Sequence, residues 1–158
     1  MIARWQQGRP TIETLVNERK LERVPANRAL ADEYLSQAAA HLATSARAQG
    51  EDPVGEFQLA YDAARKAMTA ILLNQGLRPT SKGGHVVVGE AILAQLDPPH
   101  GETFRPFRWM RPLRNDSEYP RPDRPTATAG DAEEARRCAR QMVAKAHELL
   151  DVMPSFGR

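Results

Sequence analysis

Residues 52–76 read DPVGEFQLAYDAARKAMTAILLNQG, and they carry the clearest amphipathic pattern in the chain. Asp52 followed by Pro53 is a strong helix start, because the carboxylate can cap free amide groups and proline fits the first turn. Gly76 is a natural residue to end the helix. The apolar positions recur at the three- and four-residue spacing of one helical face: Phe57, Ala60, Tyr61, Ala64, Met68 and Ile71. This pattern predicts a long helix whose apolar face lies in the core.

The segments on either side predict further helices. Asn27 is a plausible N-cap, and Thr128 with Asp131 resembles a capping box. Three valines at 86–88 favour a strand locally, but the chain offers no second strand to pair with them, and the residues that follow have a helical period. Beside the helix at 52–76, the predicted helices span about 11–24, 27–49, 84–96, 103–118 and 128–152. The sequence therefore predicts an all-α bundle of five to six helices, with a loop at 77–84.

Length and composition indicate one soluble domain. The 158 residues are enough for a single hydrophobic core, which we place at about 26–152, with 1–25 as a short helix and an arm. The one cysteine, Cys138, excludes an internal disulfide and a multi-cysteine metal site, and no motif indicates a metal or a cofactor. No apolar run approaches the roughly 20 residues of a membrane span, and no signal peptide is visible. We expect a cytoplasmic protein that does not insert into a membrane.

A second stretch, FRPFRWMRPLRNDSEYP at 104–120, holds the densest arginine run. Its arginines recur every three residues, which on a helix predicts one broad stripe. Pro112 removes one backbone hydrogen bond, so we expect a kink there. Between Arg105 and Arg124 there are six arginines against three acidic residues, although the net charge of the chain is only +2. This local excess favours an anionic ligand, and the alternative is a solvated face of surface ion pairs.

The end of this stretch resembles a known family. An all-helical chain of this size, with Arg114 and Asn115 followed by the polar run 116–119, resembles the HEPN superfamily. The segment from Ala60 to Ala91 is also similar to the central helices of an actinobacterial-type HEPN group. The resemblance covers roughly Ala26 to Leu150, and it implies the HEPN helical bundle.

The resemblance also implies a function. HEPN motifs have an arginine, four to six residues and then a histidine, and two copies form a metal-independent endoribonuclease site across a homodimer. Members occur as toxins, as phage-defence effectors and as partners of nucleotidyltransferases. Carried over to this chain, Arg114 and Tyr119 are the candidate catalytic residues. Asn115 is the common polar neighbour and, with Arg108 and Arg111, a candidate for binding substrate.

Tyr119 occupies the position where the family has histidine. Cleavage of RNA without a metal needs a base for the 2′-hydroxyl and an acid for the leaving oxygen. Free histidine has a pKa of about 6.5 and can do both, whereas free tyrosine has a pKa of about 10 and is a poor base. Tyrosine can still donate a proton or bind a phosphate. His85 and His100 are possible substitutes, but neither lies in the motif and no spacing places them near it.

Two other functions remain open. In one, the bundle is a non-catalytic HEPN binding module that pairs with a nucleotidyltransferase, as in a toxin–antitoxin pair. In the other, it is a structural or regulatory helical protein. For the motif residues themselves, Arg114 can pair with Glu118 four residues later, and Asn115 can pair with Tyr119 at the helix end.

Overall fold

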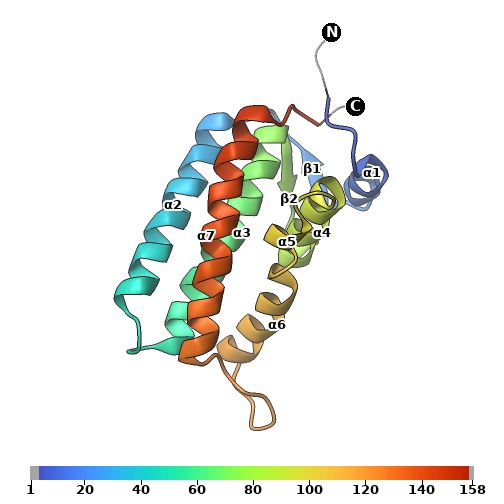
Figure 1. The fold of residues 1–158 in the computed structure, drawn as a ribbon. Coiled ribbons are helices and arrows are strands. Elements are labelled where there is room, and N and C mark those ends of the chain that lie inside the picture. Colours follow the sequence, from blue (N-terminus) through green and yellow to red (C-terminus); the bar gives the residue numbers. More distant parts are fainter. Residues whose placement is uncertain (1–3, 157–158) are drawn as a thin grey trace.

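The computed structural model describes residues 4–156 and contains three long helices side by side: α2 (Arg28–Arg47), α3 (Pro53–Gln75) and α7 (Ala129–Val152) (Figure 1). Each begins at a side-chain cap. The side chain of Asn27 accepts a hydrogen bond from the amide of Leu30, and that of Asp52 accepts one from the amide of Gly55. Thr128 forms a capping box with Asp131. These caps lie where the sequence predicts them, and the all-helical bundle is confirmed.

Four shorter helices lie on the other side of the bundle. They are α1 (Arg9–Asn17), α4 (Gly84–Leu96), α5 (Gly101–Phe104) and α6 (Phe107–Glu118) (Figure 1). Of these, α4 and α6 pack on α3, and both α1 and α5 pack on α4. The valines at 86–88 lie in α4, as the helical period predicts. α3 packs against α2, α4, α6 and α7, which explains why so many of its side chains are buried. No helix in residues 4–156 is long and apolar enough to cross a membrane.

The prediction for the N-terminal region is wrong in part. The predicted helix at 11–24 ends at Asn17, and residues Leu21–Arg23 instead form β1, which pairs antiparallel with β2 (Leu77–Pro79) inside the predicted loop. Arg19 adopts a left-handed φ of 62°, and the amide of Lys20 donates to the carbonyl of Leu15, so the chain turns out of the helix there. Three-residue strands carry too little alternation to be recognised in a sequence.

The predicted helix at 103–118 is two helices. α5 ends at Phe104 and α6 begins at Phe107, with a turn at Arg105 and Pro106 between them. Proline has no amide hydrogen, so Pro106 cannot continue the hydrogen bonds of α5. α6 does continue through Pro112 to Glu118.

A buried ion pair joins α2, α3 and α7. Nη1 of Arg136 lies 2.7 Å from Oε1 of Glu56, and the two side chains are 3% and 0% exposed. The hydroxyl of Ser45 donates to the backbone carbonyl of Glu56, and the amide of Gly50 donates to its Oε2. Every part of the carboxylate is thus engaged, which is the condition under which a buried charge is tolerated.

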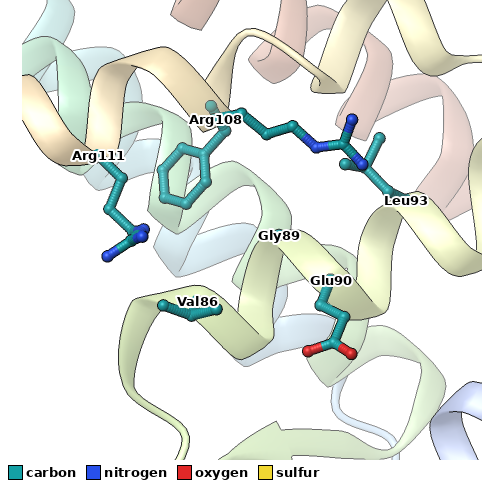
Figure 2. A pocket seen from close by; sticks show the side chains of 7 residues that line it. Val86, Gly89, Glu90, Leu93, Arg108 and Arg111 are labelled. Atoms are coloured by element: carbon teal, nitrogen blue, oxygen red, sulfur yellow. The ribbon is translucent and has the colours of Figure 1, made fainter.

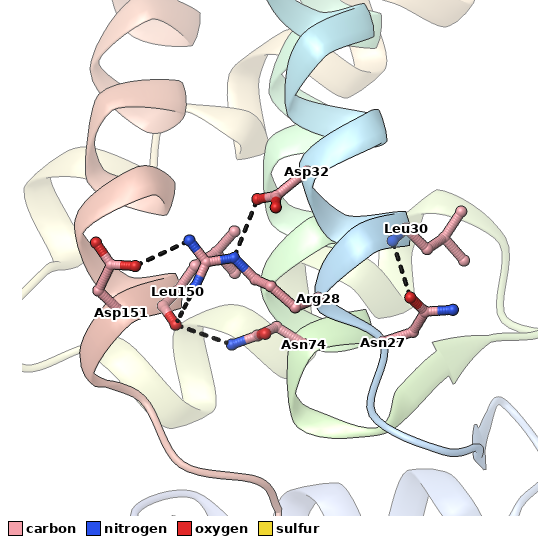
Figure 3. Close-up of polar contacts among 7 residues, drawn as sticks. All are labelled: Asn27, Arg28, Leu30, Asp32, Asn74, Leu150 and Asp151. Carbon is pink, nitrogen blue, oxygen red and sulfur yellow. Dashed lines mark hydrogen bonds and ion pairs between the residues drawn. The ribbon is translucent and has the colours of Figure 1, made fainter.

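The opposite end of these helices is joined by Arg28. Its guanidinium donates to Asp32, to Asp151 and to the backbone carbonyl of Leu150, and Asn74 donates to that same carbonyl (Figure 3). These contacts hold the C-terminal end of α7 against the beginning of α2 and the end of α3. The long helices are therefore a rigid support for the shorter helices that pack on α3.

Candidate functional site

The arginines of 104–120 do not form one stripe. Both guanidinium nitrogens Nε and Nη2 of Arg105 donate to the carboxylate of Asp97, at 2.9 and 2.8 Å. Arg108 and Arg111 line a pocket between α4 and α6, and Arg114 turns toward α3. Three residues advance a helix by only about 300°, so each arginine lies about 60° behind the last. Along α6 that drift separates Arg108 from Arg114 and leaves Arg111 between the pocket and α3, while Arg105 lies in the turn before the helix.

Arg114 lies over a tyrosine of α3. Its Cζ is 5.7 Å from the ring centroid of Tyr61, and the side chain of Arg114 is 24% exposed. The ring of Phe107 stacks on Tyr61 with centroids 5.0 Å apart and planes 13° apart. Because Phe107 and Arg114 are seven residues apart, two helical turns, they lie on the same face of α6. The packing of α6 against Tyr61 therefore fixes where Arg114 points.

The same tyrosine holds a histidine of α4. The hydroxyl of Tyr61 is 2.8 Å from Nδ1 of His85, and the side chain of His85 is half-buried. His85 is the second residue of α4, after Gly84, which has a left-handed φ of 57°. A glycine adopts that conformation without steric cost, so the turn into α4 can place His85 beside α3. Tyr61, His85, Arg65 and Arg114 together are called the α3–α4–α6 site below.

Positive charge dominates the electrostatics of the α3–α4–α6 site. Burial lowers the pKa of His85, and Arg65, Arg114 and Arg111 lower it further, while Asp62 opposes them. Burial raises the pKa of Tyr61 to about 12, against the opposing effect of the same three arginines. Both groups are therefore neutral at pH 7, and the surrounding charge is suited to a bound anion.

A pocket of about 340 Å³ adjoins this site (Figure 2). Arg108 and Arg111 extend from α6 on one side, and Val86 and Glu90 lie on α4 opposite them. Val86 directly follows His85, so the pocket and the α3–α4–α6 site are neighbours along α4. Its remaining lining is mostly apolar: Gly89, Leu93 and Phe107. The pocket combines two arginines and one carboxylate, Glu90, with an apolar wall, so its lining carries a net positive charge that suits a phosphate joined to a flat or apolar group.

The other predicted site residues lie at the end of α6. Tyr119 is 68% exposed and lines a shallow hollow with Asn115. Arg114 lies 3.3 Å from Glu118, and its Nη1 is 3.5 Å from Oδ1 of Asn115, so Arg114 contacts both neighbours on its own helix. His100 lies at the start of α5 and interacts with the charge of Glu148 on α7. The structure thus brings Arg114 and His85 to the same tyrosine, Tyr61, while Tyr119 lies on the exposed surface.

The HEPN domain family model matches residues 31–149, about three quarters of the chain. The chain belongs to the HEPN family. The match extends from α2 to α7 and includes α6 with Arg114, so the family assignment covers every residue of the α3–α4–α6 site. No curated protein and no solved structure matches the chain.

Two members of the α3–α4–α6 site, Tyr61 and Arg65, were not identified from the sequence, and a third, His85, was considered only as a possible substitute for the motif histidine. Tyr61 fits an apolar core stripe and Arg65 a solvated face, and nothing local connects either of them to position 85. A signal did exist, because all three lie in the segment at 60–91 that resembles the central HEPN helices. Among residues 4–156, no three histidine, cysteine, aspartate or glutamate side chains are grouped as metal ligands.

Proposed function

We propose that this HEPN protein acts on RNA, as a toxin or phage-defence effector, and that it binds the RNA backbone at Arg108, Arg111 and Arg114. One observation carries the proposal. Arg114, the arginine of the HEPN motif, lies over Tyr61 beside a histidine, within a surface where Arg65 and Arg111 also concentrate positive charge. Guanidinium groups bind phosphate in a planar, two-point geometry, so this arrangement favours a phosphodiester over a small apolar ligand.

The chemistry that this site favours is metal-independent cleavage of RNA. Attack of the 2′-oxygen on the neighbouring phosphorus creates negative charge on the phosphate oxygens, and Arg114 is placed to stabilise that charge. Tyr119, at the motif position of the histidine, is a candidate proton donor to the leaving oxygen. Asn115 is the candidate that orients the strand beside Arg114. A second copy of the chain completes such a site in the proposed homodimer.

The test is cleavage of RNA in EDTA together with binding of the same RNA as salt is increased. Wild type is compared with Arg114→Ala, Tyr119→Phe and a matched control, Arg137→Ala, in which the lost arginine is exposed on α7 and pairs with Glu134. We expect Arg114→Ala to lose cleavage and weaken binding, and the control to do neither. RNA that stays intact and unbound in every sample contradicts the proposal. The mass of the native protein reports whether it is a dimer.

A second candidate function is a binding module that serves a nucleotidyltransferase. One observation favours it: the side chain of Tyr119 is 68% exposed, so its hydroxyl can enter the active site of another protein. Such a partner would transfer a nucleotidyl group from a nucleoside triphosphate to the tyrosine oxygen and release pyrophosphate. Incubation with the partner would then raise the mass of wild type by one or more nucleotidyl groups. An unchanged mass, or an equal gain in Tyr119→Phe, excludes Tyr119 as the acceptor.

A further inference from the structure

We propose that His85 of α4, rather than Tyr119 of α6, is the catalytic residue that takes the proton from the 2′-hydroxyl, and that Tyr61 is its positioning residue. The inference rests on the proposed function, because it concerns the same bound RNA strand. It differs from the family motif in one respect: the histidine comes from a different helix, and it shares with Arg114 a contact to Tyr61 instead of a position on α6.

The geometry of the His85 ring supports this role. Among residues 4–156, Tyr61 is the one partner of a His85 ring nitrogen, through Nδ1 at 2.8 Å. When Nδ1 carries the hydrogen and donates it to the tyrosine oxygen, Nε2 has a free lone pair. This is the arrangement in which one nitrogen fixes the ring and the other accepts a proton. The half-buried position of His85 between α3 and α6 leaves part of the ring open to a ligand.

The charges that face His85 favour the form that acts as a base. They come from both helices packed against it: Asp62 and Arg65 on α3, and Arg111 and Arg114 on α6. Burial and the three arginines outweigh the single carboxylate, so the pKa of His85 is lowered and the neutral ring predominates at pH 7. The N-terminus of α4 also disfavours a cation there. Tyr119, by contrast, lies on the surface with its side chain 68% exposed, so burial does not favour a base there.

The proposed reaction transfers the phosphorus from the 5′-oxygen of one nucleotide to the 2′-oxygen of its neighbour within the RNA strand. Nε2 of His85 takes the 2′-hydroxyl proton as the 2′-oxygen forms a bond to phosphorus. The bond from phosphorus to the 5′-oxygen breaks, and that oxygen leaves with the hydroxyl proton of Tyr119, the donor of the proposed function. Tyr119 then takes a proton from water while His85 gives its proton to water, so the enzyme returns to its starting form. Arg114 and Arg111 stabilise the negative charge on the phosphate throughout.

Bound RNA also helps the step, because its phosphate compensates the cations around His85. In the free protein these arginines oppose a charged imidazole. Arg65 and Arg114 each have a carboxylate neighbour, Asp62 and Glu118. A phosphate between the arginines adds further negative charge and so lowers the cost of the imidazolium that forms during the reaction. The same groups that bind the strand thus make the proton transfer easier once it is bound.

The experiment uses the full chain, a fluorescent single-stranded RNA of mixed sequence, and EDTA. His85→Asn is the decisive variant, because an asparagine amide can replace Nδ1 as the partner of Tyr61 but offers no titrating Nε2. Tyr61→Phe keeps the stacked ring and removes the hydroxyl. His147→Gln, an exposed histidine on α7, is the matched control. Binding is measured by anisotropy on a strand with 2′-deoxy linkages, and folding by circular dichroism.

We expect His85→Asn to bind RNA like wild type and to cleave it about 10²–10⁴-fold more slowly, the usual contribution of a general base. We expect Tyr61→Phe to lower kcat by less, with KM unchanged, and to move the acidic limb of the pH profile. Cleavage at the wild-type rate by a folded His85→Asn overturns the inference. If Arg114→Ala is inactive in the same assay, the proposed function still stands. Intact RNA with wild type overturns the cleavage and this inference together.

Discussion

Removal of the buried arginine of the bundle should be the most damaging single change outside the site. Arg136→Met fills the same space but removes the positive charge. The carboxylate of Glu56, which is 0% exposed, then keeps only the hydrogen bond from the backbone amide of Gly50 among the contacts of its carboxylate given above. Breaking a buried pair in this way typically costs about 3–5 kcal/mol. For a chain of this size, each kcal/mol lowers Tm by about 2–4 °C. The variant should therefore melt about 6–20 °C below wild type.

The measurement is urea and thermal unfolding followed by circular dichroism. Arg137→Met is the matched control, because Arg137 is the neighbouring residue and is exposed, and its ion pair with Glu134 lies on the surface. Its stability should barely change. The double variant Glu56→Gln with Arg136→Met should recover most of the loss, since no buried charge remains. A loss below about 1 kcal/mol in Arg136→Met would refute the idea that this pair joins the three long helices.

Three further predictions concern the site and one turn. Arg111→Gln should reduce the salt dependence of single-stranded RNA binding by about 0.7 in the slope of log K against log salt, the contribution of one phosphate contact; an unchanged slope would place Arg111 outside the interface. Arg65→Gln removes a positive neighbour and should raise the pKa of His85 toward 6.5, so the acidic limb of the pH profile of kcat/KM should move to higher pH. A limb that stays in place would show that Arg65 does not influence the group that acts as the base. Gly76→Ala should lower the free energy of unfolding by about 1–2 kcal/mol or more, measured by urea denaturation, because Gly76 has a φ of 85° and an added Cβ would lie 2.8 Å from the carbonyl oxygen of Val24. Equal stability would show that the turn relaxes to accept the Cβ.

The long helices could be predicted from local chemistry. Asn27, Asp52 and Thr128 each cap a helix where the sequence places a short polar side chain before an amphipathic pattern. Caps and apolar spacing involve neighbours within one or two turns, so a single sequence contains the whole signal. Gly76 ends α3 for the same reason, with the left-handed φ that favours glycine.

The shorter elements depend on distant partners. β1 exists because Leu21–Arg23 pairs with Leu77–Pro79, more than fifty residues later, and neither segment indicates a strand alone. The separation of α5 from α6 at Pro106 has a local cause, but a proline is also common in the first turn of a helix, so its effect cannot be decided from spacing.

The site shows the same division. Arg114 could be proposed as a site residue from the sequence, because its motif lies on one helix. Its contact with Tyr61, and the contact of Tyr61 with His85, join residues that are 53 and 24 positions apart. The motif position of the histidine on α6 is held by Tyr119, whereas the packing of α4 and α6 on α3 brings His85 and Arg114 to Tyr61. Only the tertiary structure contains that information.

The titration of His85 tests the account most directly. His85 is followed by NMR as pH is varied, in the free protein and with a 2′-deoxy oligonucleotide that cannot be cleaved. We expect a pKa below 6.5 in the free protein and a higher pKa when the strand is bound, because a phosphate between Arg114 and Arg111 favours the imidazolium. Arg114→Ala should weaken this response. A bound oligonucleotide that leaves the titration of His85 unchanged would contradict the assignment of the α3–α4–α6 site as the place where RNA is held.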